Sequence, residues 1–211
     1  MPNVVIFDLD GTLIDSRKDL TTAINLTRNY YKLPPLELAT VCGFVGNGVR
    51  KLMERSLAKT GINIDDALPH MKKFYEEHFI DETVLYPGVV DGLRKLNASG
   101  LKLAVITNKP SQAAKLLLNK LEVDKYFDEI MGDGCGYPLK PAPDALLYFV
   151  DKWQAAPKKS WMVGDHYTDL EAGNLAGLAC CWASYGFGDT RDLKYNLKVE
   201  SFSEFVDAAI G

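Results

Sequence analysis

Short apolar runs that stop at polar residues constrain the fold of this chain more than any other feature. Val4–Phe7 is a run of β-branched and aromatic residues, and it ends at Asp8. Two further runs, within residues 102–106 and 160–163, end in the same way. A short run without apolar–polar alternation is typical of a strand buried on both faces, as in the middle of a parallel sheet.

Helix-length segments separate these runs in the second part of the chain. We expect helices over residues 92–98, 111–121, 144–153 and 169–176, and weaker strands over 129–131 and 179–182. Ser111 is the expected N-cap of its segment. Strand and helix alternate throughout residues 85–211, which is the signature of a parallel sheet covered by helices. We therefore predict an α/β fold with a Rossmann-like parallel-sheet core.

Residues 15–84 follow a different pattern. Helices are expected at 19–31, 48–59 and 66–79, without a convincing strand between them, and Pro34, Pro35, Gly61 and Pro69 punctuate the stretch. The sequence thus predicts a Rossmann-like catalytic core made of residues 1–14 and 85–211. An all-helical cap domain of residues 15–84 is expected to be inserted into it.

The composition of the 211 residues excludes several classes of protein. With 47% hydrophobic and 25% charged residues, the chain resembles an average globular protein rather than a disordered one. The formal net charge of −4 indicates no basic surface for nucleic acid or an anionic membrane. The four cysteines form no C-x-x-C pair, and the N-terminal residues lack a basic leader region. We expect a cytoplasmic protein that binds neither nucleic acid nor membrane; its oligomeric state stays open.

Carboxylate, hydroxyl and amide side chains follow the three strongest predicted strands. Because ligands of parallel sheets bind outside the carboxyl ends of the strands, these side chains are expected to meet there. They are Asp8, Asp10, Thr107, Asn108, Asp165 and Asp169.

Converging carboxylates need a partner. Asp8 and Asp10 share one side of an extended segment, and Asp165 and Asp169 are spaced to share one face of the first turn of a helix. Such groups repel one another strongly in a cleft of reduced dielectric. A bound Mg²⁺ relieves this repulsion, because it takes oxygen ligands from carboxylates, water and phosphate.

Four motifs resemble those of the haloacid dehalogenase-like hydrolase superfamily, and they occur in the right order. They are Asp8-Leu9-Asp10-Gly11-Thr12-Leu13, Thr107-Asn108, Lys140-Pro141, and Gly164-Asp165 followed by Asp169. The helical block after the first motif resembles the all-helical type of cap domain in that superfamily.

The resemblance implies a Mg²⁺-dependent phosphatase that works through an aspartyl-phosphate. Asp8 would attack phosphorus, and Asp10 would protonate the leaving alkoxide and then deprotonate water. Lys140 would offset charge on the nucleophile and the transferred group. Thr107 and the backbone of Asn108 would hold phosphoryl oxygens.

The same resemblance implies the metal ligands. They would be the carboxylates of Asp8 and Asp165 and the backbone carbonyl of Asp10. Asp169 would bind the metal through water or support its ligands. The alternative role for Asp169 is purely structural: its carboxylate would interact favourably with the dipole at the N-terminus of the helix.

Further details narrow the reaction. Asp10 favours a phosphatase over the dehalogenase branch, and none of the histidines (His70, His78 and His166) lies early in the expected cap, which disfavours a sugar-phosphate mutase. The segment 43–48 resembles the substrate loop of phosphoglycolate phosphatases, which makes Gly46 and Asn47 candidate substrate-binding residues. It is equally compatible with a plain helix–helix connection.

The sequence therefore predicts hydrolysis of a small phosphorylated metabolite, with 2-phosphoglycolate as the best candidate. The alternatives are a phosphatase for pyrophosphate, a nucleotide or a sugar phosphate, a phosphomutase, and a regulatory protein that only binds a phosphorylated ligand. His166 stands beside Asp165 and is expected either to tune the phosphate site or to face solvent.

Overall fold

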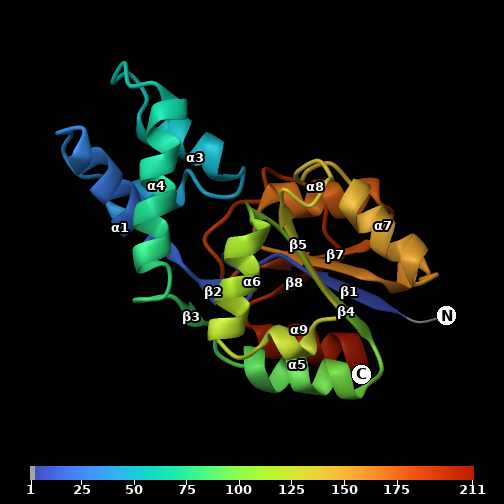
Figure 1. Cartoon of the computed structure of the whole chain (residues 1–211). Coiled ribbons are helices and arrows are strands. Elements are labelled where there is room, and N and C mark those ends of the chain that lie inside the picture. The colour runs from blue at the N-terminus through green and yellow to red at the C-terminus, as the bar shows by residue number, and fades with distance from the viewer. Residues whose placement is uncertain (1–2) are drawn as a thin grey trace.

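A six-stranded parallel sheet forms the centre of the computed structural model, which describes residues 3–211 (Figure 1). The strand order is β5-β4-β1-β6-β7-β8. The strands are β1 (Val4–Phe7), β4 (Lys102–Pro110), β5 (Glu129–Asp133), β6 (Trp161–Gly164), β7 (Ala179–Ala183) and β8 (Leu197–Val199). All neighbouring strands in this sheet run parallel, which confirms the predicted Rossmann-like α/β fold.

The central strand β1 is apolar at every position because it faces two cores. Val5 and Phe7 pack on one face of the sheet, and Val4 and Ile6 pack on the other. All four side chains are completely buried. The continuous apolar run is therefore the direct result of helices covering both faces.

The helices divide between these two faces (Figure 1). Helices α5 (Val89–Ala98), α6 (Ser111–Lys120) and α9 (Phe202–Ile210) contribute to the core that contains Phe7. Helices α7 (Asp144–Lys152) and α8 (Tyr167–Leu175) contribute to the opposite core. Short 3-10 helices, η1 (Asp124–Tyr126) and η2 (Pro157–Lys159), lie in the connections.

A second group of helices lies to one side of the sheet, at the upper left of Figure 1. It consists of α1 (Arg17–Tyr30), α2 (Leu38–Cys42), α3 (Val49–Ser56) and α4 (Ile64–His78). We call residues 17–78 the helical insert. Its helices share an apolar core of their own, which includes Ile24, Met53 and Met71.

Two short strands mark the ends of the insert. β2 (Ile14–Asp15) pairs antiparallel with β3 (Val84–Leu85), so the chain leaves and re-enters the sheet unit at one place. The division into residues 1–14 and 85–211 against 15–84 stays a prediction that this arrangement supports.

Some local expectations were wrong. Ser111 is the first residue of α6 rather than its N-cap, because β4 continues to Pro110, which occupies the cap position without a side-chain hydrogen bond. Pro69 lies inside α4 and does not interrupt it. β8 and α9 were not expected from the sequence, although Ser201 caps α9 and Phe202, Phe205 and Val206 form its buried stripe.

Two further observations concern the described residues as a whole. The four cysteines are free thiols, two of them buried. Within residues 3–211, no helix has both the length and the apolar character needed to cross a membrane.

The core on the α5 side gives a first prediction. Leu93 is completely buried, whereas Leu116 on α6 is 46% exposed. We expect Leu93→Ala to lower the free energy of unfolding by about 2–5 kcal/mol, because it leaves a cavity. Leu116→Ala, the matched control, should change it by at most about 0.5 kcal/mol. Urea unfolding measures both, and equal effects would contradict this assignment of the core.

Candidate active site

The carboxyl ends of β1, β4 and β6 bring the predicted polar side chains together. Asp8 follows β1 directly, and its N–H continues the sheet by donating to the carbonyl of Val163 at 2.9 Å. Thr107 and Asn108 lie within the last residues of β4, and Asp165 follows β6. One edge of the sheet therefore carries side chains from three strands, as the sequence predicts.

Lys140 enters this edge from the loop between β5 and α7. Its Nζ lies 2.8 Å from Oδ1 of Asp8, 2.7 Å from Oδ1 of Asp169 and 2.6 Å from the carbonyl oxygen of Ile106. The two carboxylates raise the pKa of Lys140 above its ordinary value even though burial opposes this. The ammonium therefore stays charged and bridges both carboxylates.

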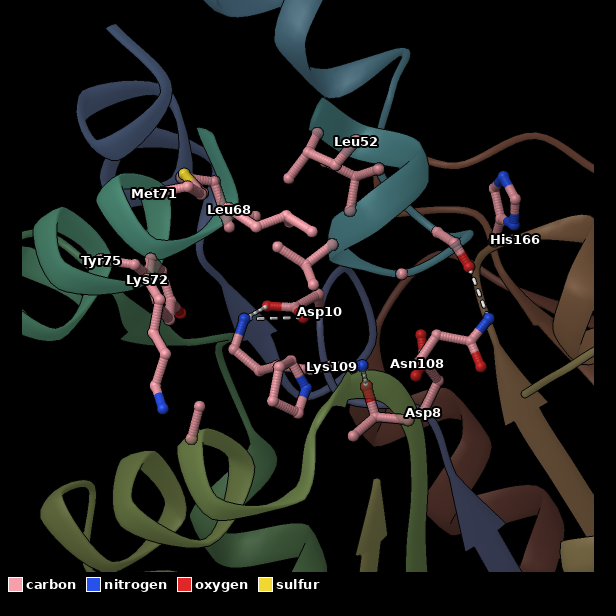
Figure 2. A pocket seen from close by; sticks show the side chains of 18 of the residues that line it. Asp8, Asp10, Leu52, Leu68, Met71, Lys72, Tyr75, Asn108, Lys109 and His166 are labelled. Carbon is pink, nitrogen blue, oxygen red and sulfur yellow. Dashed lines mark hydrogen bonds and ion pairs between the residues drawn. The ribbon is translucent and has the colours of Figure 1, made fainter. Parts of the chain in front are cut away.

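The side chain of Asn108 holds Lys140 in position. The N–H of Lys140 donates to Oδ1 of Asn108, and Nδ2 of Asn108 donates to the carbonyl of Lys140, both at 2.9 Å. Nδ2 also donates to the carbonyl of Gly46 in the insert at 2.8 Å (Figure 2). The sequence predicts a role for the backbone of Asn108, and the structure adds this role for its amide.

Asp8, Asp165 and Asp169 form a buried carboxylate cluster. Each offers one oxygen atom, and these atoms all lie within 4.8 Å of one another. Burial, with repulsion from Asp169, raises the pKa of Asp8 to about 6, although Lys140 opposes the shift. Burial and repulsion from Asp169 and Asp8 likewise raise the pKa of Asp165 well above its ordinary value.

Asp165 is fixed by backbone groups of the loop after β7. Its Oδ2 accepts the N–H of Phe187 at 2.9 Å and the N–H of Gly188 at 2.8 Å. Gly11 packs against the same carboxylate: its φ is +88°, and a Cβ atom there would lie 2.0 Å from Oδ2 of Asp165. Glycine at position 11 is thus required by both the turn and the close approach.

The expected geometry of Asp165 and Asp169 was wrong in one respect. Helix α8 begins at Tyr167 with His166 as its N-cap, so Asp165 precedes the helix instead of sharing a face of its first turn with Asp169. Oδ2 of Asp169 accepts the N–H of His166 at 3.0 Å in a capping box. Its other oxygen remains directed at Lys140, so both carboxylates still reach the cluster.

The cluster fits a divalent cation. Three carboxylates and one ammonium carry a formal charge of −2, and burial makes this excess costly. Carboxylate oxygens are also the ligands that Mg²⁺ prefers. Asp8 and Asp165 would hold the ion together with the backbone carbonyl of Asp10, and Asp169 would bind it through water or support its ligands.

Asp10 has a separate partner. Its two carboxylate oxygens each lie 2.9 Å from Nζ of Lys109 (Figure 2). The hydroxyl of Ser16 donates to Oδ1. The ring of Tyr75, from α4 of the insert, lies 4.7 Å from Nζ of Lys109. Sequence reasoning missed Lys109. The spacing rule for strands, by which Lys109 shares a side with Thr107, would have placed it at this edge.

The loop of residues 43–48 joins the insert to the core. Gly46 has φ +108°, and a Cβ there would lie 2.6 Å from the ring of His166. The amide of Asn47 is engaged on both sides: Nδ2 donates to the hydroxyl of Tyr167 at 2.8 Å, and Oδ1 accepts from Arg55 at 2.7 Å. Of the two residues of this loop predicted to bind substrate, Gly46 lines the cavity between insert and sheet, whereas the amide of Asn47 is occupied in joining the insert to the core.

His166 is buried rather than solvent-facing. Burial lowers its pKa to about 4, so the ring is neutral at physiological pH. The other histidines lie on the insert: His70 stacks on Tyr30, and His78 pairs with Asp81.

A cavity of about 570 Å³ lies between the insert and this edge of the sheet (Figure 2). Its core side includes Asp8, Asp10 and Thr107. Its insert side is largely apolar, with Val45, Val49, Leu52, Leu68, Met71 and Tyr75. A ligand in this cavity would meet carboxylates and cations at one end and apolar side chains over most of the other.

Comparison with known proteins assigns the family. The model for haloacid dehalogenase-like hydrolases matches residues 5–183. The chain belongs to the haloacid dehalogenase-like hydrolase family. The resemblance inferred from the four motifs is confirmed.

Similar hydrolases have names that specify a reaction. A phosphoglycolate phosphatase of Pseudomonas putida is 38% identical over 202 residues, which cover 92% of this chain and 73% of that protein. A phosphoglycolate phosphatase of Chromobacterium violaceum is 35% identical over 209 residues, which cover 96% of this chain and 94% of that protein. The crystal structure of a predicted phosphoglycolate phosphatase from Haemophilus somnus 129PT superposes with a TM-score of 0.90 at 28% identity. The match covers 98% of this chain and 97% of that one.

The raised pKa of Asp8 gives a prediction for the hydrolase in EDTA. A folded-state pKa of about 6, against an ordinary value of 3.8, means that the native form binds this proton more tightly than the unfolded form. The stabilisation that this bound proton adds to the free energy of unfolding therefore falls as pH rises from about 4 to 6, and it stays low above pH 6. At pH 8, Asp8→Asn should therefore be more stable than wild type by about 1–3 kcal/mol.

Urea unfolding between pH 4 and 8 measures this difference, which should shrink toward pH 4. Asp151→Asn, at an exposed position on α7, serves as the control. An Asp8→Asn variant that is less stable than wild type at pH 8 in EDTA would contradict the repulsion described here.

Proposed function

We propose that the protein is a Mg²⁺-dependent phosphatase that hydrolyses a small phosphomonoester by way of a phosphorylated Asp8. The observation that carries this proposal is the position of Asp8, which is held by Lys140 next to Asp165 and Asp169, with Asp10 two residues further on. A site that only bound a phosphorylated ligand would not need a nucleophile and a separate proton carrier at this spacing.

Asp8 is oriented for attack. Lys140 binds its Oδ1, and its Oδ2 accepts no hydrogen bond in the described part of the chain. In the first step, a carboxylate oxygen of Asp8 forms a bond to phosphorus while the bond from phosphorus to the ester oxygen breaks. The electron pair of that bond leaves with the ester oxygen, and Asp10 supplies the proton that converts it to an alcohol.

The second step uses the same residues in reverse. Asp10, now a carboxylate, takes a proton from a water molecule while the oxygen of that water attacks phosphorus. The bond between Asp8 and phosphorus breaks, and inorganic phosphate leaves. Thr107 and the backbone of Asn108 would hold the phosphoryl oxygens, and Lys140 offsets the charge on Asp8. A bound Mg²⁺ would supply the remaining charge neutralisation between the carboxylates and the phosphate.

The helical insert acts as a cap in this proposal. Gly46 and Tyr75 reach the edge of the sheet from the insert, and apolar side chains cover much of the cavity. Closing such a cap over the phosphate excludes water and lets the insert select the leaving group.

The candidate substrate is 2-phosphoglycolate. Support comes from the named activity of relatives that are 38% and 35% identical across most of this chain. The second candidate is a larger phosphomonoester, such as a sugar phosphate or a nucleotide. The cavity volume of about 570 Å³ favours this alternative.

Activity should depend on Asp8 and on the metal. We expect wild-type protein with Mg²⁺ to release phosphate from at least one phosphorylated metabolite in a panel that includes 2-phosphoglycolate and pyrophosphate. Asp8→Asn should lose roughly a thousandfold or more in kcat, and EDTA should have a similar effect. The exposed variant Asp151→Asn should keep wild-type activity. Full activity of Asp8→Asn would refute the proposed nucleophile.

The role of Asp10 predicts a dependence on the leaving group. Asp10→Asn should reduce kcat/KM for an alkyl phosphate by roughly 10²–10⁴-fold, because the alkoxide then leaves without a proton. The loss should be much smaller for p-nitrophenyl phosphate, whose leaving group is stable as an anion. Equal losses on both substrates would show that Asp10 does not act as the acid.

A further inference from the structure

Two basic side chains line the cavity in the described part of the chain, and they differ in position. Lys72 is exposed at the rim, with its Nζ 3.8 Å from Glu76. Lys109 is buried, with a side-chain exposure of 4%. Lys140, the other lysine of the site, is engaged with Asp8, Asp169 and a backbone carbonyl. Lys109 is therefore the buried cation that lines the leaving-group side.

Hydrogen-bond capacity remains on Lys109. An ammonium has three N–H donors, and the two oxygens of Asp10 take two of them. No further carboxylate or carbonyl oxygen of the described residues accepts the third donor; its neighbour is Tyr75, whose ring centre lies 4.7 Å from Nζ and whose hydroxyl raises the pKa of Lys109. Lys109 can thus bind a further anionic oxygen without leaving Asp10.

The hydroxyl of Tyr75 supplies an independent sign of a ligand. Tyr75 is only 9% exposed and lines the cavity, and its hydroxyl finds no hydrogen-bond partner within residues 3–211. A buried polar group without a partner is costly, so such groups are normally satisfied. Here a second donor stands unused beside a buried ammonium.

We propose that Lys109 and Tyr75 together recognise a carboxylate on the leaving group of the substrate. An ammonium N–H and a phenol O–H suit the two oxygens of a carboxylate, and the apolar wall formed by Leu52, Leu68 and Met71 strengthens the attraction by excluding water (Figure 2). This inference rests on the proposed phosphatase function and assigns the part of the site that selects the substrate.

The position of Lys109 also limits where that carboxylate lies. Asp10 must reach the ester oxygen to protonate it, and Lys109 is bound to both oxygens of Asp10. In this proposal, a carboxylate joined to the ester oxygen through one carbon atom contacts Lys109 and Tyr75 while Asp10 contacts the ester oxygen. The proposal therefore predicts phosphomonoesters of short hydroxy acids as substrates. An apolar group in the same place would leave both donors unpaired, and a hydroxyl offers one uncharged oxygen in place of the two charged oxygens of a carboxylate.

The test compares two substrates that differ only at this group. 2-Phosphoglycolate and 2-hydroxyethyl phosphate have the same chain length, with a carboxylate replaced by a hydroxymethyl group. We expect wild-type kcat/KM to favour the carboxylate by roughly a hundredfold, because the hydroxymethyl group lacks the negative charge that pairs with Lys109 and offers one oxygen for two donors.

Variants assign the preference to residues. Lys109→Met should abolish the preference, and Lys109→Arg should keep part of it. Tyr75→Phe should lower it roughly tenfold while retaining the ring over Lys109. Lys73→Met, at an exposed position of the same helix, should keep the wild-type preference. If Lys109→Met lowers kcat/KM equally for both substrates, Lys109 only positions Asp10 and the inference is wrong.

Binding gives a readout that does not need turnover. Calorimetry on Asp8→Asn with Mg²⁺ should show tighter binding of 2-phosphoglycolate than of 2-hydroxyethyl phosphate, with the difference lost on adding Lys109→Met and reduced on adding Tyr75→Phe. Equal binding of both ligands would overturn the inference. If wild type prefers a larger, uncharged phosphomonoester, the carboxylate site is refuted while the phosphatase function stands; absence of any phosphatase activity would refute the function itself.

Discussion

The ion pairs of Lys140 are the interaction on which the site depends. Without this ammonium, Asp8, Asp165 and Asp169 would place three carboxylates together in a buried space, which folding tolerates poorly. Even with it, the pKa of Asp8 is raised to about 6. In the proposed function, a bound cation and a phosphate would offset this unfavourable arrangement. A divalent ion bound there would relieve the remaining repulsion.

The parallel sheet explains how such a cluster is built from distant parts of the chain. Neighbouring parallel strands end at the same edge, so residues separated by more than 150 positions, such as Asp8 and Asp165, come into contact. The strands could be predicted from their continuous apolar runs, because a strand buried on both faces is apolar at every position. The Rossmann-like fold and the convergence of Asp8, Thr107 and Asp165 could therefore be predicted from local pattern alone.

Other parts of the site depend on tertiary contacts that no local pattern encodes. The two backbone N–H groups that bind Asp165 come from Phe187 and Gly188, in an irregular loop. The position of Asp169 depends on His166 acting as an N-cap, which is not among the preferred capping residues. Tyr75, which lies next to Lys109, comes from α4 of the insert. Spacing rules bring strand residues together, but they do not say which helix of an insert will cover them.

Asn108 connects the edge of the sheet with the helical insert. Its amide binds both the carbonyl and the N–H of Lys140, and the same Nδ2 atom binds the carbonyl of Gly46 in the insert. Movement of the loop around Gly46 therefore acts on the side chain that positions Lys140. Because Lys140 in turn binds Asp8, the position of the insert and the charge next to the nucleophile are linked through three consecutive contacts. In the proposed function, a substrate that draws the insert onto the sheet would thereby also stabilise the arrangement in which Asp8 can react.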